Sequence, residues 1–225
     1  MAKRILITIT MAIFIYISLP FVTNFTPATE LSQLSQKYVN DGPDEVGAPN
    51  LVTAVIVTYR GLDTLGEIAV LFIATAGIGF ILSREKKTNS SKRESSAILK
   101  TGTKVLVPLI LMFGIYIFMN GHLTPGGGFQ GGVIIASGLL ISILANPHGK
   151  LNKFLIQLTE SISGFGYVMI GLLGLFLAGG FLDNSIIPLG QFGRLFSAGA
   201  IPIIYSLIGL KVGSELVNIL SYLKN

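Results

Sequence analysis

Six long apolar stretches constrain the fold of this chain more than any other feature of the sequence. Soluble domains carry about 25% charged residues, whereas this chain has 12% charged and 51% hydrophobic residues. A helix needs about 20 mostly apolar residues to cross the hydrocarbon core of a bilayer. We therefore predict an all-α integral membrane protein with about six transmembrane helices. The stretches cover approximately residues 5–22, 51–82, 105–120, 132–145, 154–182 and 195–223.

The lengths of these stretches predict irregularities. The second, fifth and sixth are longer than a span requires, so we expect them to tilt, protrude or break. The third and fourth are short and flank a glycine-rich segment. The first has a basic start and an apolar run, which is also typical of a cleaved signal peptide. No A-x-A cleavage site follows it, which favours an uncleaved anchor.

The distribution of basic residues predicts the orientation in the membrane. Alternate loops carry twelve Lys and Arg residues on one side and two, Lys37 and Arg194, on the other. Cytoplasmic loops are rich in Lys and Arg, so both termini are predicted to be cytoplasmic. The net charge of +5 is then a property of membrane loops, and nucleic acid is not expected as a partner.

A polar, lysine- and serine-rich segment at 83–103 separates two predicted modules. The first module, 1–82, holds two spans, and the second, 104–225, holds four. We interpret 83–103 as a flexible cytoplasmic linker that sets the topology. Contact with anionic lipid or a peripheral subunit is the alternative.

The sequence contains no cysteine. This excludes disulfides, thiolate zinc sites and cysteine-ligated iron–sulfur clusters in this chain. The two histidines, His122 and His148, lie far apart in the sequence. We therefore expect no haem, metal centre, other cofactor or catalytic centre here.

The second stretch contains three charged residues, Arg60, Asp63 and Glu67. At the spacing of an α-helix, they share a polar face with Thr53 and Thr64, and the rest of the helix is apolar. A charge at the bilayer centre costs at least about 2.5–3.5 kcal/mol, so this face should contact protein. Arg60 and Asp63 are ion-path candidates with Glu67; the alternatives are a neutralised Arg60–Asp63 pair that locks helix packing, or a position of Arg60 near the outer interface. Glu67 is left over near the middle of the stretch, and we interpret it as a candidate for exchanging a proton or a cation.

The sixth stretch also contains an acid and a base, Lys211 and Glu215, on a face shared with Ser214 and Asn218. Their spacing of four residues is typical of a helix salt bridge. However, Lys211 is too deep in the stretch to reach the headgroups easily, so an ion path is an equally good interpretation. In the fifth stretch, Glu160 is expected to reach the cytoplasmic interface.

The third and fourth stretches are joined by the glycine-rich segment NGHLTPGGGFQGG, residues 120–132. Its glycines and proline predict that it is not regular helix. No Gly-Lys-Ser/Thr follows, which excludes a phosphate-binding loop. We expect either a broken helix–loop element at membrane depth or a site where a neighbouring subunit's helix packs closely. The residues that define this motif are His122, Pro125, Gly126, Gly127, Gly128, Phe129, Gly131 and Gly132.

Two segments resemble known membrane subunits. GHLTPGGGFQGGVIIASGLL, 121–140, resembles the B subunit of Mrp-type multisubunit sodium/proton antiporters (the MnhB family), and this resemblance extends from about residue 101 to the end. NLVTAVIVTYRGLDTLGEIAVLFIA, 50–74, resembles the carboxyl-terminal module of the large A subunit of the same antiporters. Both modules also occur as the small, separate E- and F-type subunits of membrane-bound hydrogenases and related respiratory complexes. Their fusion departs from the usual Mrp arrangement.

The resemblance implies an accessory subunit of a cation (Na⁺)/proton antiporter in the inner (plasma) membrane of a prokaryote. Other membrane subunits would be its partners, and Na⁺ and H⁺ the transported ions. Pro125, Gly126–Gly128 and Phe129 would shape the ion path or an interface, and Asp63 and Glu67 match acidic positions of the A-subunit module. The alternatives are an ion-translocating membrane-arm subunit of a redox-driven complex such as a hydrogenase, and a non-transporting scaffold. A self-contained channel or carrier is less favoured, because no inverted repeat is evident.

Overall fold

The computed structural model describes residues 2–25, 30–83, 94–149 and 151–224. Within these ranges the regular structure is helical and contains no strand. Six of the helices are long and apolar enough to cross a membrane, which confirms the predicted all-α fold with six spans. These segments are Lys3–Thr23, Gly61–Leu82, Ala97–Met119, Gly128–Ala145, Lys153–Leu177 and Ile201–Leu223.

The chain divides into two compact units, Met1–Gln36 and Lys37–Asn225. The first unit contains α1 (Ala2–Thr23), whose large apolar side chains are exposed along its length. The hydroxyl groups of Thr8 and Thr10 donate hydrogen bonds to carbonyl oxygens one turn earlier. Because these polar groups are satisfied within the helix, the exposed surface of α1 is compatible with lipid.

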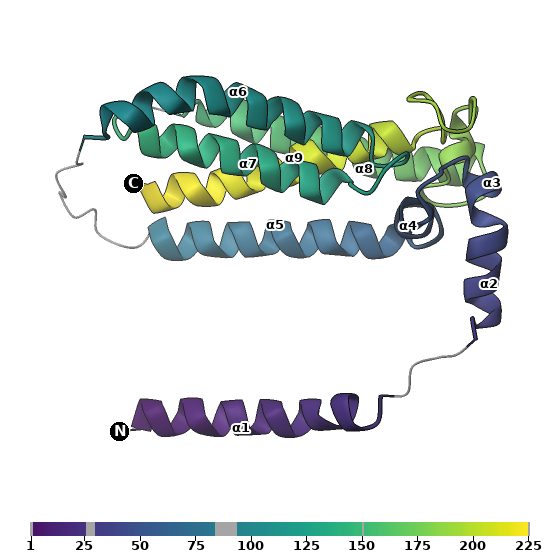
Figure 1. Cartoon of the computed structure of the whole chain (residues 1–225), viewed down its shortest axis with the longest axis horizontal. Helices are drawn as coiled ribbons and strands as arrows, with labels where there is room; N and C mark the ends of the chain where they lie inside the picture. The colour runs from purple at the N-terminus through teal and green to yellow at the C-terminus, as the bar shows by residue number, and fades with distance from the viewer. Residues whose placement is uncertain (1, 26–29, 84–93, 150, 225) are drawn as a thin grey trace. The chain divides into compact units, whose positions relative to one another are not determined.

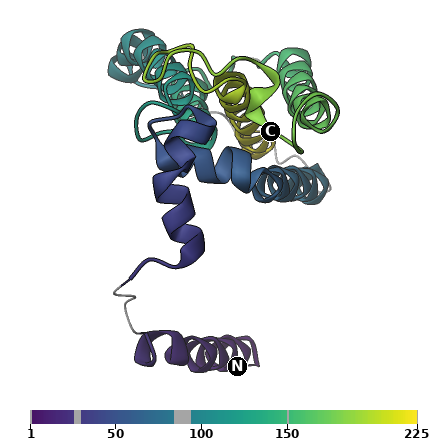
Figure 2. The same ribbon diagram turned by 90° about the vertical axis from the view of Figure 1, so that its right-hand side faces the viewer.

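The second unit is a bundle of five long helices around α9 (Ile201–Lys224) (Figures 1 and 2). This helix contacts the four others, and many of its residues between Ile201 and Val217 are almost completely buried. A helix that is apolar on most sides belongs in the centre of a bundle. The surrounding helices are α5 (Gly61–Ser83), α6 (Ala97–Met119), α7 (Gly128–Ala145) and α8 (Lys153–Leu177).

The helices α6, α7 and α9 meet through glycines. A Cβ atom on Gly131 would lie 2.6 Å from the carbonyl oxygen of Gly114 on α6, and one on Gly132 would lie 2.7 Å from that of Gly209 on α9. The prediction that the whole glycine-rich segment is non-helical is therefore wrong, because α7 begins at Gly128. Close packing between helices outweighs the low helix propensity of glycine, and the packing partners belong to the same chain.

The second apolar stretch is broken, as its length allows. It forms a short turn, α4 (Leu51–Thr53), a π-helical segment, η1 (Ala54–Tyr59), and then α5, with Arg60 at the junction in a non-helical conformation. Near the break, the Thr64 hydroxyl donates to the carbonyl oxygen of Ile56 at 2.7 Å. The prediction of one polar face along a continuous helix is therefore wrong, since Thr53 does not lie on α5.

The predicted linker overlaps a helix. Residues 84–93 lie outside the described residues, but α6 begins at Ala97, where the Ser96 hydroxyl accepts a hydrogen bond from the amide of Leu99 at 3.2 Å. Serine is a favoured N-cap, so the last part of the polar segment 83–103 starts the third span.

Shorter elements cap the end of the bundle where α5 and α9 begin (Figure 1). They are α3 (Gly42–Val46) and the 3-10 turn η2 (Asn184–Ile186), whereas α2 (Gln33–Asn40), of which residues 37–40 belong to this unit, precedes α3 and has no buried residue. Buried Asn184 joins η2 to α3 and to the loop before α9, because its amide donates to the carbonyl oxygens of Val46 and Ala198 at 2.8 and 3.0 Å. The loop between the last two spans is therefore ordered by polar contacts.

Candidate intramembrane ion site

A cluster of three charged side chains lies between α8 and α9. The Lys211 ammonium is 2.7 Å from Glu215 Oε1, one turn further along α9, and 3.5 Å from Glu160 Oε1 on α8. The amide of Asn218 donates to Glu160 Oε2 at 3.0 Å. One lysine therefore bridges two carboxylates from different helices, and we call these four residues the Lys211 cluster.

The charged side chains of the Lys211 cluster are buried between two helices that are long and apolar enough to span a membrane, α8 and α9. These side chains are 10% (Lys211), 13% (Glu160) and 0% (Glu215) exposed. Lys211 lies thirteen residues before Lys224, which corresponds to about 20 Å along a helix. This is too far for its side chain to reach the headgroups, so the ammonium depends on protein partners.

Two further contacts position the lysine. The Phe72 ring on α5 lies 4.7 Å from the Lys211 ammonium, in cation–π geometry. Gly164 on α8 leaves space for the lysine stem, since a Cβ there would lie 3.3 Å from Lys211 Cε. Residues of α5, α8 and α9 thus all contribute to the position of the Lys211 ammonium.

The cluster carries unequal numbers of acids and bases. Two carboxylates and one ammonium have a formal charge of −1 when all three are ionised. Glu215 Oε1 is engaged by the ion pair, but among the described residues Glu215 Oε2 has no hydrogen-bond partner. An uncompensated buried carboxylate is costly, so the cluster favours binding one additional positive charge.

Two cavities flank the cluster and differ in chemistry. The first, which we call the polar crevice, lies between α5, α8 and α9 and has a volume of about 370 Å³. Besides Phe72, Ala76 and Tyr222, its lining consists of Thr75, Gln157, Glu160, Ser161 and Asn218.

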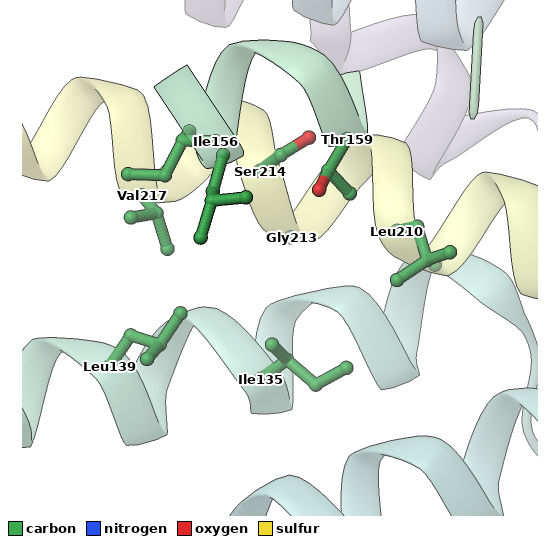
Figure 3. Close-up of a pocket in the computed structure, with 10 residues that line it drawn as sticks. Ile135, Leu139, Ile156, Thr159, Leu210, Gly213, Ser214 and Val217 are labelled. Atoms are coloured by element: carbon green, nitrogen blue, oxygen red, sulfur yellow. The ribbon is translucent and has the colours of Figure 1, made fainter. Parts of the chain in front are cut away.

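The second cavity, which we call the apolar groove, lies between α7, α8 and α9 and has a volume of about 170 Å³. Figure 3 shows its wall of aliphatic side chains, among them Ile135, Leu139 and Ile156, with Thr159 and Ser214 as the polar exceptions. Glu160 borders the crevice and not the groove, so an ion would approach it from the α5 side.

The predicted acidic residues of the second stretch lie outside this cluster. Arg60 and Asp63 form an ion pair with side chains 62% and 55% exposed. Glu67 is exposed on α5, and because that helix begins at Gly61 it is the seventh helical residue and not a central one.

The structure brings together Lys211 and Glu215, as their spacing predicts, and adds Glu160. The expectation that Glu160 reaches the cytoplasmic interface stays a prediction; among the described residues its carboxylate contacts Lys211 and Asn218. In the sequence, the only indication that Glu160 belongs to such a cluster is its position as an acid within an apolar stretch. Its partner lies 51 residues away in the sequence, so local spacing does not reveal the pair.

The first part of the glycine-rich motif lies near the amino-terminal end of α9, away from the Lys211 cluster. There it forms a joint, held by hydrogen bonds, with the segment before α5. The carbonyl oxygen of Gly121 accepts hydrogen bonds from the Asn50 amide at 2.7 Å and the Thr53 hydroxyl at 2.6 Å, and Tyr205 on α9 donates to Thr53 at 3.0 Å. His122 is completely buried, with Nε2 3.3 Å from the Arg194 carbonyl oxygen. These contacts connect the segment before α5 to the four-helix part of the chain.

The remaining motif residues surround this joint. Pro125 is exposed, whereas Phe129 packs against the hydrophobic core. Gly126 and Gly127 leave room for the backbone of Ile117 and the side chains of Gln130 and Tyr205. Gly128 lies against Ile208. Apart from exposed Pro125, these residues make packing contacts with other parts of the chain.

Acidification is expected to loosen this joint. Burial lowers the pKa of His122 below its ordinary value of 6.5, against the opposing effect of nearby backbone hydrogen bonds. The unfolded chain then binds a proton more readily than the folded one, so the contribution of His122 to stability is complete above pH 6.5 and is lost as the pH falls. We expect the melting temperature of the purified assembly to fall more between pH 7.5 and 5.5 in the wild type than in His122→Asn. An equal fall in both would contradict this role.

The family model for the domain related to MnhB of Na⁺/H⁺ antiporters matches residues 98–218, which is more than half of the chain. The chain belongs to the MnhB family. A second family model, MbhE, which describes the E subunit of MBH, matches residues 3–97. The two matches meet at the start of α6.

Relatives of this MnhB-family chain carry different descriptions. An uncharacterised protein of Methanocaldococcus jannaschii is 31% identical, with 82% of each chain covered. The B subunit of the Na⁺/H⁺ antiporter of Bacillus subtilis is 36% identical over 40% of this chain and 59% of the relative. The match thus spans little more than half of that curated relative.

Two solved structures share the fold of this MnhB-family chain. A chain of the membrane-bound sulfane sulfur reductase, an archaeal respiratory membrane complex, is 41% identical, with 99% of this chain and 98% of that chain covered and a TM-score of 0.82. A chain of the Mrp complex from Dietzia sp. is 24% identical, with 100% and 26% covered and a TM-score of 0.77. Both belong to multisubunit membrane complexes.

Proposed function

We propose that this chain is an accessory membrane subunit of a multisubunit cation (Na⁺)/proton antiporter in the plasma membrane of a prokaryote. It contributes to an intramembrane ion path and to the packing of neighbouring subunits, and it holds no catalytic centre of its own. The observation that carries the proposal is the Lys211 cluster, because buried acids and bases at membrane depth usually mark ion pathways.

Membership of the MnhB family supports this function, and so does the likeness to chains of larger membrane complexes. The exposed apolar surface of the bundle supports it as well, because such surface is covered by lipid or by other membrane subunits. Glu67 is exposed on this surface. A carboxylate facing acyl chains is unfavourable, so we expect a partner subunit to cover that face of α5 and to extend the polar path.

The role of Glu67 is tested by Glu67→Gln in the assembled complex. We expect normal assembly and reduced Na⁺/H⁺ exchange in everted membrane vesicles, measured as dissipation of an imposed pH gradient by Na⁺. Glu94→Gln is the matched control, because it makes the same substitution in an exposed ion pair, with Lys100, that contributes no more than about 1 kcal/mol. Unchanged exchange in an intact Glu67→Gln complex would assign Glu67 to packing and support the scaffold alternative for this residue.

A second candidate function is ion translocation in the membrane arm of a redox-driven complex. The similarity to a chain of an archaeal respiratory complex over 99% of this sequence favours it, as does the match to the MbhE family model. Isolation of the native complex in a mild detergent separates the two candidates. Partners that contain iron–sulfur clusters or nickel would establish the redox-driven complex, and a complex of antiporter subunits alone would establish the first function.

A further inference from the structure

We propose that the polar crevice is a water-filled entrance through which one monovalent cation, H⁺ or Na⁺, reaches Glu160 and exchanges there, while Lys211 stays paired with Glu215. This inference rests on the proposed function, because it specifies the entrance and the exchanging carboxylate of the ion path.

The two carboxylates of the cluster differ in how they are held. Glu215 is fully buried, lies on the same helix as Lys211 and contacts it at 2.7 Å. Glu160 lies on α8, contacts Lys211 at 3.5 Å and borders the crevice. A cation that arrives through the crevice meets Glu160 first. It can replace the weaker Lys211–Glu160 contact without separating the shorter Lys211–Glu215 pair.

The charge of the cluster sets the valence of the ion. With both acids ionised and Lys211 protonated, the formal charge is −1, and one monovalent cation neutralises it. A divalent cation would leave a net positive charge in a medium where charge is costly. Oxygen-bearing side chains around the site, Glu160, Ser161, Asn218 and Thr75, provide ligands that suit a hard cation and hydrogen bonds that suit a hydrated proton.

The lining of the crevice indicates that water fills it. Polar side chains at membrane depth need hydrogen-bond partners, and the crevice of about 370 Å³ exceeds the roughly 10–15 Å³ that one buried water requires. The apolar groove on the other side of α8 lacks such a lining. Both cavities border α8 and α9 but only the crevice has a polar lining, so the groove serves as the control when access of water is tested.

Cysteine accessibility tests the entrance. Because the chain has no native cysteine, single substitutions Ala76→Cys and Ser161→Cys in the crevice, and Leu139→Cys and Ile156→Cys in the groove, are each introduced into the complete complex. A charged, water-soluble methanethiosulfonate is added to native membranes, and modification of this chain is followed by mass spectrometry. We expect the crevice positions to react more than about tenfold faster than the groove positions, because the charged reagent is excluded from apolar surroundings. Equal rates would overturn the proposal.

Carbodiimide labelling tests the exchanging group. Dicyclohexylcarbodiimide reacts with protonated carboxyl groups inside membranes, so we expect it to modify Glu160 and not Glu215 in the intact complex, with the signal absent in Glu160→Gln. Slower labelling in Na⁺ than in choline would identify Na⁺ as the ion, and equal labelling in both salts would identify the proton. Modification of Glu215, or none at Glu160, would overturn the proposal.

Both measurements need only an assembled complex and not transport activity. A complex that catalyses antiport but shows no preferential labelling of the crevice would contradict this inference and leave the proposed function intact. A labelled crevice in a complex without Na⁺/H⁺ exchange would support the inference and contradict the proposed antiport.

Discussion

Lys211→Met is expected to destabilise the subunit by about 3–5 kcal/mol, because removing one partner of a buried ion pair leaves the other charge uncompensated. Glu215 is fully buried, and Lys211 is its only cationic partner among the described residues. Methionine has a similar length and fills the same space beside Phe72, so it removes the charge and its cation–π contact without opening a cavity. The measurement is the amount and the melting temperature of the assembled complex.

The double variant Lys211→Met/Glu215→Gln separates stability from transport. It removes both charges of the short pair, so assembly and melting temperature should return toward the wild type. Na⁺/H⁺ exchange should remain impaired, because Glu160 then has no fixed cation beside it. A Lys211→Met complex that assembles and melts like the wild type would show that the pair does not stabilise the fold.

Gly132→Ala is expected to destabilise the bundle by about 1–3 kcal/mol, the usual cost of overpacking, and Gly132→Val by more. The added Cβ would lie 2.7 Å from the carbonyl oxygen of Gly209 and 2.9 Å from Val212 Cβ. The first of these is a backbone atom, which cannot move aside as the end of a side chain can. Loss of complex yield and a lower melting temperature would be the readout.

Gly77→Ala is the matched control for this prediction. Gly77 is also a helical glycine, but no described atom would lie within 4 Å of its Cβ. Alanine favours helix over glycine by up to about 1 kcal/mol, so this variant should be neutral or slightly more stable. If Gly132→Ala behaved like Gly77→Ala, close contact between α7 and α9 would not explain the glycine.

The six spans were predictable because apolar runs of sufficient length depend only on local sequence. The glycine-rich segment was partly mispredicted because its structure depends on contacts with helices that are distant in the sequence. Its helical part from Gly128 is stabilised by Gly114 and Gly209, which lie on other helices. Propensity alone assigned those residues to a loop, and tertiary packing made them helix.

The candidate site was predictable only where its partners are close in sequence. Lys211 and Glu215 lie one helical turn apart and were identified together, whereas Glu160 reaches them from another helix. Similarly, whether Glu67 lies in the middle or near the end of a helix depends on the residue at which α5 begins. The apolar run continues through the π-helical segment, so hydropathy did not show that α5 begins only at Gly61.

The glycine contacts described above also determine which parts of the bundle have freedom to move. Helix α7 touches both α6 and α9 at the level of the main chain, so any displacement of α7 against either helix must separate or compress peptide groups. By contrast, α5 and α8 face α9 through side chains such as Phe72, Leu207 and Lys211, which can change rotamer. In a working cycle the first three helices would therefore serve as a rigid frame, and conformational steps that open or close access to the ion would fall on α5 and α8.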